Sequence, residues 1–231
     1  MGKNKLKKFA ENLTFRHLIQ PDLNEVLHTD HPMKGNWKKQ IFGNENPIIL
    51  ELGCGRGEYT IGLSRLFKEK NFIGVDIKGA RLWRGAKTVE EEKISNAAFL
   101  RTRIECITSF FAPGEVDEIW LTFPDPQLKE RRAKKRLTSP SFLEKYKLFL
   151  CPEGPVNLKT DSAEMAGFTT DVIRYNQLTV LYHTDDLYSE QQIPEELHII
   201  TGYEKKFLEE GKKIHYIRFL LDNQKLLAYP Y

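Results

Sequence analysis

Three glycines and a carboxylate follow an apolar run in the first quarter of the chain. Residues 47–50 (PIIL) are followed by residues 51–58 (ELGCGRGE), which predicts a strand, a tight turn and the start of a helix. Glycines in such a turn tolerate a positive φ and let the backbone approach a ligand closely. Glu51 precedes Gly53, the first glycine, and its carboxylate suits a cationic or amine-bearing ligand better than a diphosphate.

The glycine spacing separates two classes of ligand. A dinucleotide-binding turn has the spacing G-x-G-x-x-G, whereas residues 53–57 have G-x-G-x-G. S-adenosylmethionine carries an ammonium and a sulfonium, which gives Glu51 a physical role. Asp76, which closes the next predicted strand, could accept hydrogen bonds from both ribose hydroxyls. A nicotinamide dehydrogenase and a glycine turn without a ligand are the alternatives.

Polar residues also follow the third predicted strand. Arg103, Ile104 and Glu105 lie where an adenine edge is expected, and the Glu105 carboxylate could accept a hydrogen bond from the exocyclic amine. A solvated surface carboxylate at Glu105 is an equally good interpretation.

A carboxylate between two prolines ends the fourth predicted strand. Residues 118–123 (EIWLTF) are followed by Pro124-Asp125-Pro126, so Asp125 lies at the carboxyl end of a central strand, where ligands bind in open α/β sheets. The prolines restrict the backbone around Asp125, as a catalytic or orienting group requires, although the same tripeptide also forms plain turns. Asp125 is our candidate catalytic residue.

A basic stretch begins directly after this motif. Residues 127–136 (QLKERRAKKR) carry six basic side chains and one acid. A run of like charge is more often a solvated loop, but the position beside Asp125 favours contacts with the phosphates of a nucleic acid.

Two later segments place polar residues at the end of a strand or the start of a helix. They are residues 159–161 (KTD) and 201–204 (TGYE). Both also match the spacing of a helix capping box, Asp161 with Glu164 and Thr201 with Glu204. Capping and ligand binding can coexist at one helix start.

From residue 47 onward, strand patterns alternate with helical ones. This alternation predicts an α/β fold with a mostly parallel sheet and helices on both faces. The predicted strands are 47–52, 71–77, 97–102, 116–123, 156–159, 178–183 and 214–220, and the predicted helices are 57–67, 80–93 and 141–150. Residues 1–46 have no strand pattern and are expected to form a basic extension that becomes ordered on RNA, whereas residues 47–231 form the main domain.

Composition narrows the class of protein. The 231 residues are 40% hydrophobic, enough for a real core, and the net charge of +3 is a mild bias. The three cysteines are far apart and without histidine-rich company, so neither a disulfide framework nor a metal site is expected. No apolar window approaches the roughly 20 residues of a membrane span, so we expect a soluble, cytoplasmic protein.

Taken in chain order, these motifs resemble those of the tRNA guanine-N7 methyltransferase family. The family has an acid in its glycine loop, an acid at the second strand, an F-[PS]-D-P motif, a basic stretch, K-T-D and T-x-Y-E, and this chain has each in that order. The likeness extends from residues 5–11 (KLKKFAE) to residues 204–214 (EKKFLEEGKKI), so it covers nearly the whole chain.

The resemblance implies an S-adenosylmethionine-dependent enzyme that methylates N7 of the variable-loop guanine (guanine 46) of tRNA. It implies the class I methyltransferase fold, Rossmann-like and seven-stranded, with the last strand antiparallel. It implies that the cofactor is bound by Glu51, Gly53, Asp76, Arg103, Glu105 and Asp125. It further implies that Asp125 is catalytic and that the target nucleotide is bound by Lys129, Asp161, Thr201, Gly202, Tyr203 and Glu204.

Three positions depart from the family pattern. Residues 127–129 (QLK) stand where Trp-Pro-Lys usually follows, so an aromatic stacking or packing partner is absent there. Asp76 is commonly glutamate, and Arg103 replaces an aspartate or asparagine. The alternative functions are a class I methyltransferase for another RNA base or a small molecule, and a non-catalytic RNA-binding module. The sequence leaves monomer and homodimer equally open.

Overall fold

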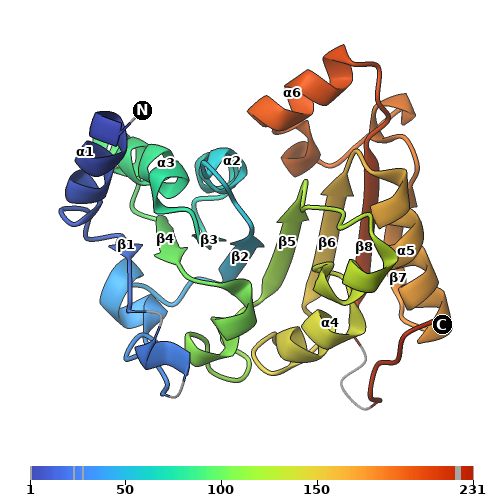
Figure 1. The fold of residues 1–231 in the computed structure, drawn as a ribbon, viewed down its shortest axis with the longest axis horizontal. Helices are drawn as coiled ribbons and strands as arrows, with labels where there is room; N and C mark the ends of the chain where they lie inside the picture. The colour runs from blue at the N-terminus through green and yellow to red at the C-terminus, as the bar shows by residue number, and fades with distance from the viewer. Residues whose placement is uncertain (1, 23, 28, 222–224, 231) are drawn as a thin grey trace.

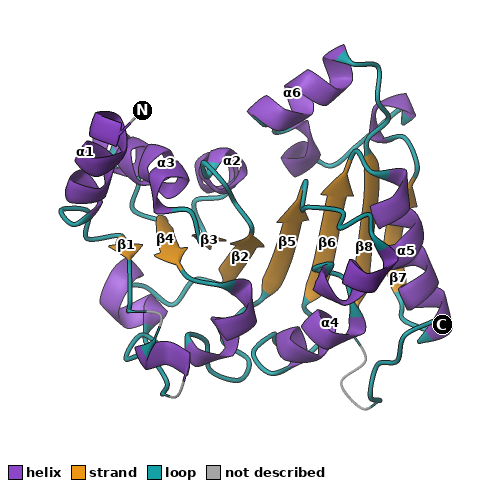
Figure 2. Ribbon diagram, viewed as in Figure 1, coloured by secondary structure: helices purple, strands orange, loops and turns teal. Residues whose placement is uncertain are grey.

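One mixed β-sheet forms the centre of the computed structural model, which describes residues 2–22, 24–27, 29–221 and 225–230. Its strands are β1 (Leu18–Ile19), β2 (Ile48–Leu52), β3 (Asn71–Asp76), β4 (Ala97–Arg101), β5 (Glu118–Thr122), β6 (Pro155–Thr160), β7 (Val180–Thr184) and β8 (His215–Leu220). They are ordered β1-β4-β3-β2-β5-β6-β8-β7 (Figure 2). Strands β1 to β6 pair in parallel, and β8 runs antiparallel to both β6 and β7.

Helices cover both faces of the sheet. They are α1 (Gly2–Asn12), α2 (Glu58–Leu66), α3 (Gly79–Glu92), α4 (Pro140–Lys147), α5 (Ala163–Tyr175) and α6 (Gly202–Glu209). Side chains alternate along β2, so that Leu50 packs in the cluster formed with α4 and α5, whereas Ile49 packs with Tyr59 of α2. The α3 residues Leu82 and Ala86 fill a third cluster. Helix α3 itself lies between α1 and α2 (Figure 1).

The predicted fold class is confirmed, with an eighth strand added. Each of the seven predicted strands overlaps an observed one, and the last strand is antiparallel as the resemblance implied. The additional strand is β1, whose two residues are too few to show a periodic pattern. The chain runs from β2 outward through β3 and β4, then returns to build β5 and β6 on the other side, so the order of strands reverses between β2 and β5. Ligands bind at such a switch point in open α/β sheets.

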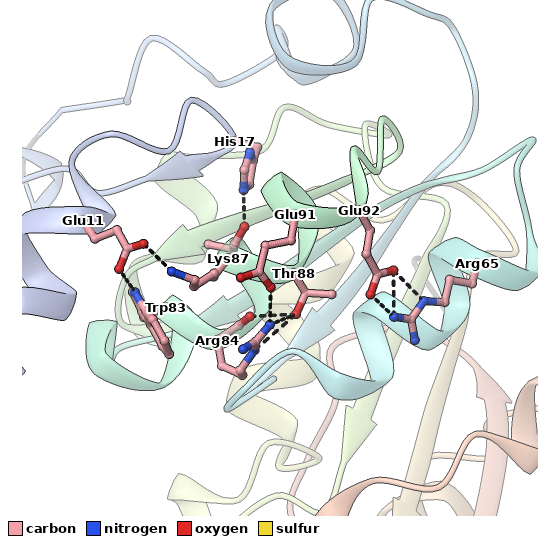
Figure 3. A network of polar contacts seen from close by, with 10 residues as sticks. Glu11, His17, Arg65, Trp83, Arg84, Lys87, Thr88, Glu91 and Glu92 are labelled. Atoms are coloured by element: carbon pink, nitrogen blue, oxygen red, sulfur yellow. Dashed lines mark hydrogen bonds and ion pairs between the residues drawn. The ribbon is translucent and has the colours of Figure 1, made fainter. Parts of the chain in front are cut away.

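The N-terminal segment packs against the main sheet and its helices. In α1, the Glu11 carboxylate accepts hydrogen bonds from Trp83 Nε1 and Lys87 Nζ of α3, both at 2.7 Å (Figure 3). Strand β1 extends the sheet beyond β4. The fully buried Trp37 indole donates to the Phe110 carbonyl at 2.8 Å. Within the described residues, 1–46 therefore contribute to the same hydrophobic core as the rest of the chain.

Figure 3 also shows two arginines held by ion pairs on the surface of α2 and α3. Arg84 donates to Glu91 at 2.9 Å, and Arg65 donates to Glu92 at 2.6 Å. No helix within the described part of the chain combines the length and the apolar character that crossing a bilayer requires.

Candidate active site

A cavity of about 990 Å³ lies at the carboxyl ends of the central strands. Its walls are the segments that directly follow β2, β3, β4, β5 and β6, together with the start of α6. The structure brings ten of the predicted site residues into this wall: Glu51, Gly53, Asp76, Arg103, Glu105, Asp125, Asp161, Thr201, Gly202 and Tyr203. Two others, Lys129 and Glu204, are not among the lining residues.

Glu51 is a buried carboxylate whose hydrogen-bond partners are neutral. Oε2 accepts from the backbone N–H of Thr60 at 2.8 Å and from the Thr60 hydroxyl, and Oε1 accepts from the Thr122 hydroxyl at 2.5 Å. Burial raises the pKa of the Glu51 carboxyl to about 7, although these hydrogen bonds oppose the shift. None of the described residues pairs a cation with this buried carboxylate at the cavity wall, which favours a ligand that brings its own positive charge.

The glycine turn leaves room beside Glu51. Gly53 and Gly55 have φ of 82° and 57°, the left-handed region that glycine tolerates best. A Cβ placed on Gly55 would meet no atom within 4 Å, whereas one on Gly57 would lie 2.5 Å from the Phe99 ring. Glycine is therefore required for backbone conformation at residue 55 and for packing at residue 57.

Asp76 is fixed against the glycine turn by two backbone amides. Its Oδ2 accepts from the Gly55 N–H at 3.1 Å and its Oδ1 accepts from the Lys78 N–H at 2.7 Å. The carboxylate is therefore held in place while it lines the cavity. Arg103 and Glu105 also line the cavity, with exposed side chains at the start of a 3₁₀ helix (Ile104–Ser109). This set of groups fits S-adenosylmethionine, because it offers Glu51 to the ammonium and Asp76 to the ribose.

The loop around Asp125 has an unusual backbone. Phe123 and Gln127 have φ of 49° and 46°, which is rare for residues with a side chain and is an outlier for one as bulky as phenylalanine. The exposed Asp125 carboxylate accepts a local hydrogen bond from the Gln127 N–H at 3.0 Å. The Arg136 guanidinium donates to the Pro126 carbonyl at 2.9 Å and is buried. Tertiary contacts thus impose the loop conformation that presents Asp125.

The basic stretch divides into structural and exposed members. Arg136 holds the loop, so it is not free to bind phosphate, whereas the other five basic side chains of residues 127–136 are exposed. Lys135 lines the cavity, and Lys129 lies outside the lining. The prediction of a charged surface beside Asp125 is thus met by Lys129, Arg131, Arg132, Lys134 and Lys135.

Asp161 lines the cavity and pairs with a lysine from another element. Lys212 Nζ lies 2.8 Å from Asp161 Oδ2. The predicted capping role of Asp161 is wrong by one residue, because the N-cap of α5 is Ser162, whose hydroxyl accepts from the Met165 N–H at 3.2 Å. Asp161 is turned toward Lys212 instead.

Thr201 and Glu204 have structural roles at the start of α6. Thr201 is the N-cap, and its hydroxyl accepts from the Glu204 N–H at 3.2 Å, which confirms the Thr201 half of the predicted capping box. The Glu204 carboxylate does not complete the box, because it pairs with Lys159. The Glu204 side chain is 0% exposed and pairs with the equally buried Lys159 at 2.7 Å. The expected contact of Glu204 with the substrate is therefore not supported, since its carboxylate is turned into the core rather than toward the cavity.

The buried Lys159 uses its three donors on one segment. Nζ donates to the carbonyls of Leu197 and Ile199 at 2.9 and 3.2 Å and pairs with Glu204. Burial lowers the pKa of the Lys159 ammonium, and the Glu204 carboxylate opposes that shift. The ammonium thereby holds the segment that leads into α6 over the end of β6.

Several functional contacts escaped the sequence analysis. Thr60 and Thr122 bind Glu51, and Glu58 accepts from the Gly202 N–H at 2.6 Å, which joins α2 to the start of α6. Phe123 and Phe207 line the cavity. The sequence could have indicated two of these residues, Thr122 and Phe123, because they directly precede the Pro124-Asp125-Pro126 motif. No group of histidine, cysteine, aspartate and glutamate suited to a metal ion occurs among the residues that the structure describes.

The chain is similar to known methyltransferases along nearly its whole length. Residues 45–217 match the model of a family described as "Putative methyltransferase". A tRNA (guanine-N(7)-)-methyltransferase of Bacteroides thetaiotaomicron is 50% identical over 230 residues, covering 100% of this chain and 90% of that protein. The chain belongs to the tRNA (guanine-N(7)-)-methyltransferase family. Another member, from Christiangramia forsetii, is 50% identical over 219 residues, covering 94% of this chain and 98% of that protein.

A solved structure of a distant methyltransferase has the same fold. The 16S rRNA methyltransferase KamB aligns with a TM-score of 0.60 at 13% identity, covering 78% of this chain and 90% of KamB. At this identity the likeness concerns the fold alone. The family resemblance and the class I methyltransferase fold predicted from the motifs are both confirmed.

Proposed function

We propose that the chain transfers a methyl group from S-adenosylmethionine to N7 of a guanine in tRNA, and that this guanine is the variable-loop guanine 46. The observation that carries the proposal is the meeting of two sets of carboxylates in one cavity. Glu51 and Asp76 lie beside the glycine turn, and Asp125 and Asp161 lie after the next two strands of the other half. Membership of the family supports both the donor and the acceptor.

The residues of the glycine half bind the donor. Glu51 faces its ammonium, Asp76 accepts from the ribose hydroxyls, and the segment from Arg103 to Glu105 lines the adenine site, with Gly53 giving the backbone close access. When bound, S-adenosylmethionine supplies a methyl group on a sulfonium, with S-adenosylhomocysteine as the product. Asp125 lines the same cavity as the glycine turn, so it borders the donor as well as the acceptor.

The protein aligns the acceptor instead of activating it. Guanine N7 has a free lone pair, so it forms the new bond to carbon without prior removal of a proton. Asp125 and Asp161 accept hydrogen bonds from N1–H and N2–H of the guanine and favour the cationic 7-methyl product electrostatically. Holding two reactants in line can lower a barrier by about 7 to 11 kcal/mol at best.

Exposed basic groups bind the RNA backbone. Lys129, Arg131 and Arg132 extend the charged surface beyond the cavity, and the N-terminal Lys5 and Lys7 are exposed as well. The target guanine must leave its place in the tRNA structure before it reaches Asp125, at a cost of a few kcal/mol. We propose recognition of shape and phosphates rather than of base edges.

Methyl transfer to defined transcripts tests the function. Labelled methyl from S-adenosylmethionine should enter an unmodified tRNA transcript, and replacement of the variable-loop guanine by adenine should abolish incorporation. Incorporation that persists after the replacement would point to another RNA base. No binding of S-adenosylhomocysteine in calorimetry would leave only an RNA-binding module.

Asp125→Asn tests the catalytic assignment. The variant keeps the size of the side chain and removes its charge, so kcat should fall by about 10²- to 10³-fold. Single-turnover transfer to the transcript measures this step, and S-adenosylhomocysteine titration reports the donor site separately. Turnover at the wild-type rate would remove Asp125 from the mechanism.

A further inference from the structure

Three aromatic side chains form one continuous wall of the cavity, here called the aromatic wall: Phe123, Tyr203 and Phe207. Phe123 follows β5, and the other two lie one turn apart on α6. Phe207 is in the middle, with its ring centroid 5.6 Å from that of Phe123 and 6.4 Å from that of Tyr203. The Tyr203 and Phe207 rings are inclined by only 24°.

The rings of the aromatic wall are held in place, but one of them remains accessible to solvent. The Tyr203 side chain is 51% exposed although it lines a cavity. Phe123 adopts its left-handed φ of 49° while its N–H donates to the Lys159 carbonyl at 2.8 Å, so the fold imposes an unfavourable backbone in order to place this ring. A half-exposed ring backed by two fixed rings offers a flat face to a ligand.

Charged groups around the wall indicate which flat ligand fits. Asp125 and Asp161 line the same cavity and are hydrogen-bond acceptors. Lys212 Nζ lies 4.3 Å from the Phe207 ring centroid while it pairs with Asp161. A planar base that stacks on the wall would therefore direct its N–H donors at carboxylates, and guanine has such donors at N1 and N2.

We propose that the aromatic wall is the stacking surface for the target guanine after it leaves the tRNA structure, with the Tyr203 ring in contact with the base. Phe207 and Phe123 are positioning residues that fix the Tyr203 ring. The inference rests on the proposed function, and it supplies the step that function requires, because a base that loses its stacking partners in RNA regains one on the protein.

Kinetics of Tyr203 variants give the first test. Tyr203→Ala should raise KM for the tRNA transcript by about 5- to 150-fold, the range expected for loss of one stacked base. Tyr203→Phe keeps the ring and should stay within about twofold of wild type. Affinity for S-adenosylhomocysteine should be unchanged in both. Tyr175→Ala, which removes a tyrosine that is 57% exposed and outside the cavity lining, is the matched control.

Fluorescence reports the stacking itself. A transcript with 2-aminopurine at the target position should emit weakly when bound to the wild-type protein with S-adenosylhomocysteine, because the ring of Tyr203 quenches the stacked base. Bound to Tyr203→Ala, the same transcript should emit strongly. Bound to Phe207→Leu, it should emit with intermediate intensity, because the Tyr203 ring loses its packing partner and becomes more mobile.

Two results overturn the inference, and both leave the proposed function standing. One is a Tyr203→Ala enzyme with wild-type KM on the guanine transcript. The other is equal emission from wild type and Tyr203→Ala at saturating protein. Failure of the proposed function has a different signature, namely a wild-type protein that transfers no methyl group to any tRNA transcript.

Discussion

The molecule buries two glutamates near one cavity, and their surroundings are opposite. Glu51, in the glycine half, is bound by hydroxyls and a backbone amide, and it lines the cavity. Glu204, at the start of α6, is paired with the buried Lys159 and lies outside the lining. Glu51 is thus suited to a cation that arrives from outside, whereas the charge of Glu204 is already balanced inside the fold.

This difference separates a ligand-binding carboxylate from a structural one. A buried charge is costly unless it is paired, so an unpaired one at a cavity wall has a raised pKa until a ligand compensates it. A buried ion pair, in contrast, fixes the geometry of the segments that carry it. Both glutamates follow from recognisable motifs, so only their partners distinguish the two roles.

The largest expected effect comes from breaking the buried pair. Lys159→Met leaves the Glu204 carboxylate buried without its cation, so the free energy of unfolding should fall by about 3 to 5 kcal/mol. The double variant Lys159→Met with Glu204→Leu removes both charges and should recover most of that loss. Urea unfolding monitored by circular dichroism measures both.

The comparison between the two glutamates fails if this cycle is additive. If the double variant loses as much unfolding free energy as Lys159→Met and Glu204→Leu lose separately when added together, then Lys159 and Glu204 act independently. Glu204→Gln serves as the mild control, because it keeps the size of the side chain.

A second, smaller effect concerns the pH dependence of Glu51. Because its folded pKa is raised from 4.5 to about 7, the carboxyl favours folding fully below about pH 4.5, and this contribution is lost as pH rises toward 7. The loss should amount to at most about 3 kcal/mol and should be absent from Glu51→Gln. Thermal unfolding of both proteins at pH 5 and pH 8 measures the difference.

Donor binding should show the opposite trend with pH. Because only the ionised Glu51 attracts an ammonium, affinity for S-adenosylhomocysteine should increase from pH 6 to pH 8 in the wild type and stay nearly flat in Glu51→Gln. Equal pH profiles for the two proteins would contradict the assignment of Glu51 to the donor.

The smallest effect is expected from exposed charge. The double variant Arg131→Ala with Arg132→Ala removes two phosphate contacts. The plot of the logarithm of tRNA affinity against the logarithm of salt concentration has a negative slope, and its magnitude should decrease by about 1 to 2. Arg65→Ala removes an exposed arginine of α2 that is paired with Glu92 of α3, and it should leave the slope unchanged. An unaltered slope in the double variant would place RNA binding elsewhere.

Much of the fold was predictable because strands β2 to β6 are buried on both faces and their sequences are apolar runs between turns. Helices α1, α5 and α6 were not among the predicted helices, although the capping patterns at Asp161 and Thr201 marked the starts of α5 and α6 to within one residue. Helix α5 contains Gly167 and the β-branched Thr169, Thr170, Val172 and Ile173, which lower helix propensity, so its formation depends on packing against the sheet. Strand β1 exists only because it pairs with β4.

The candidate site was predictable to the extent that its residues follow strands. Asp76, Asp125 and Asp161 each end or follow a parallel strand, and parallel strands deliver such residues to one edge. The aromatic wall was not predictable, because Phe123 and Phe207 are separated by more than eighty positions in the chain and meet only through the placement of α6.

The sequence alone determined the strand, turn and helix around Glu51, the carboxylates at the strand ends and the family to which the chain belongs. Those features depend on local spacing. Only the tertiary structure decided that Glu204 pairs with Lys159 and that Glu51 has neutral partners. The physical reason is that period-2 alternation sets which face of β6 carries Lys159, whereas its partner is selected by the packing of a segment some forty residues further along the chain.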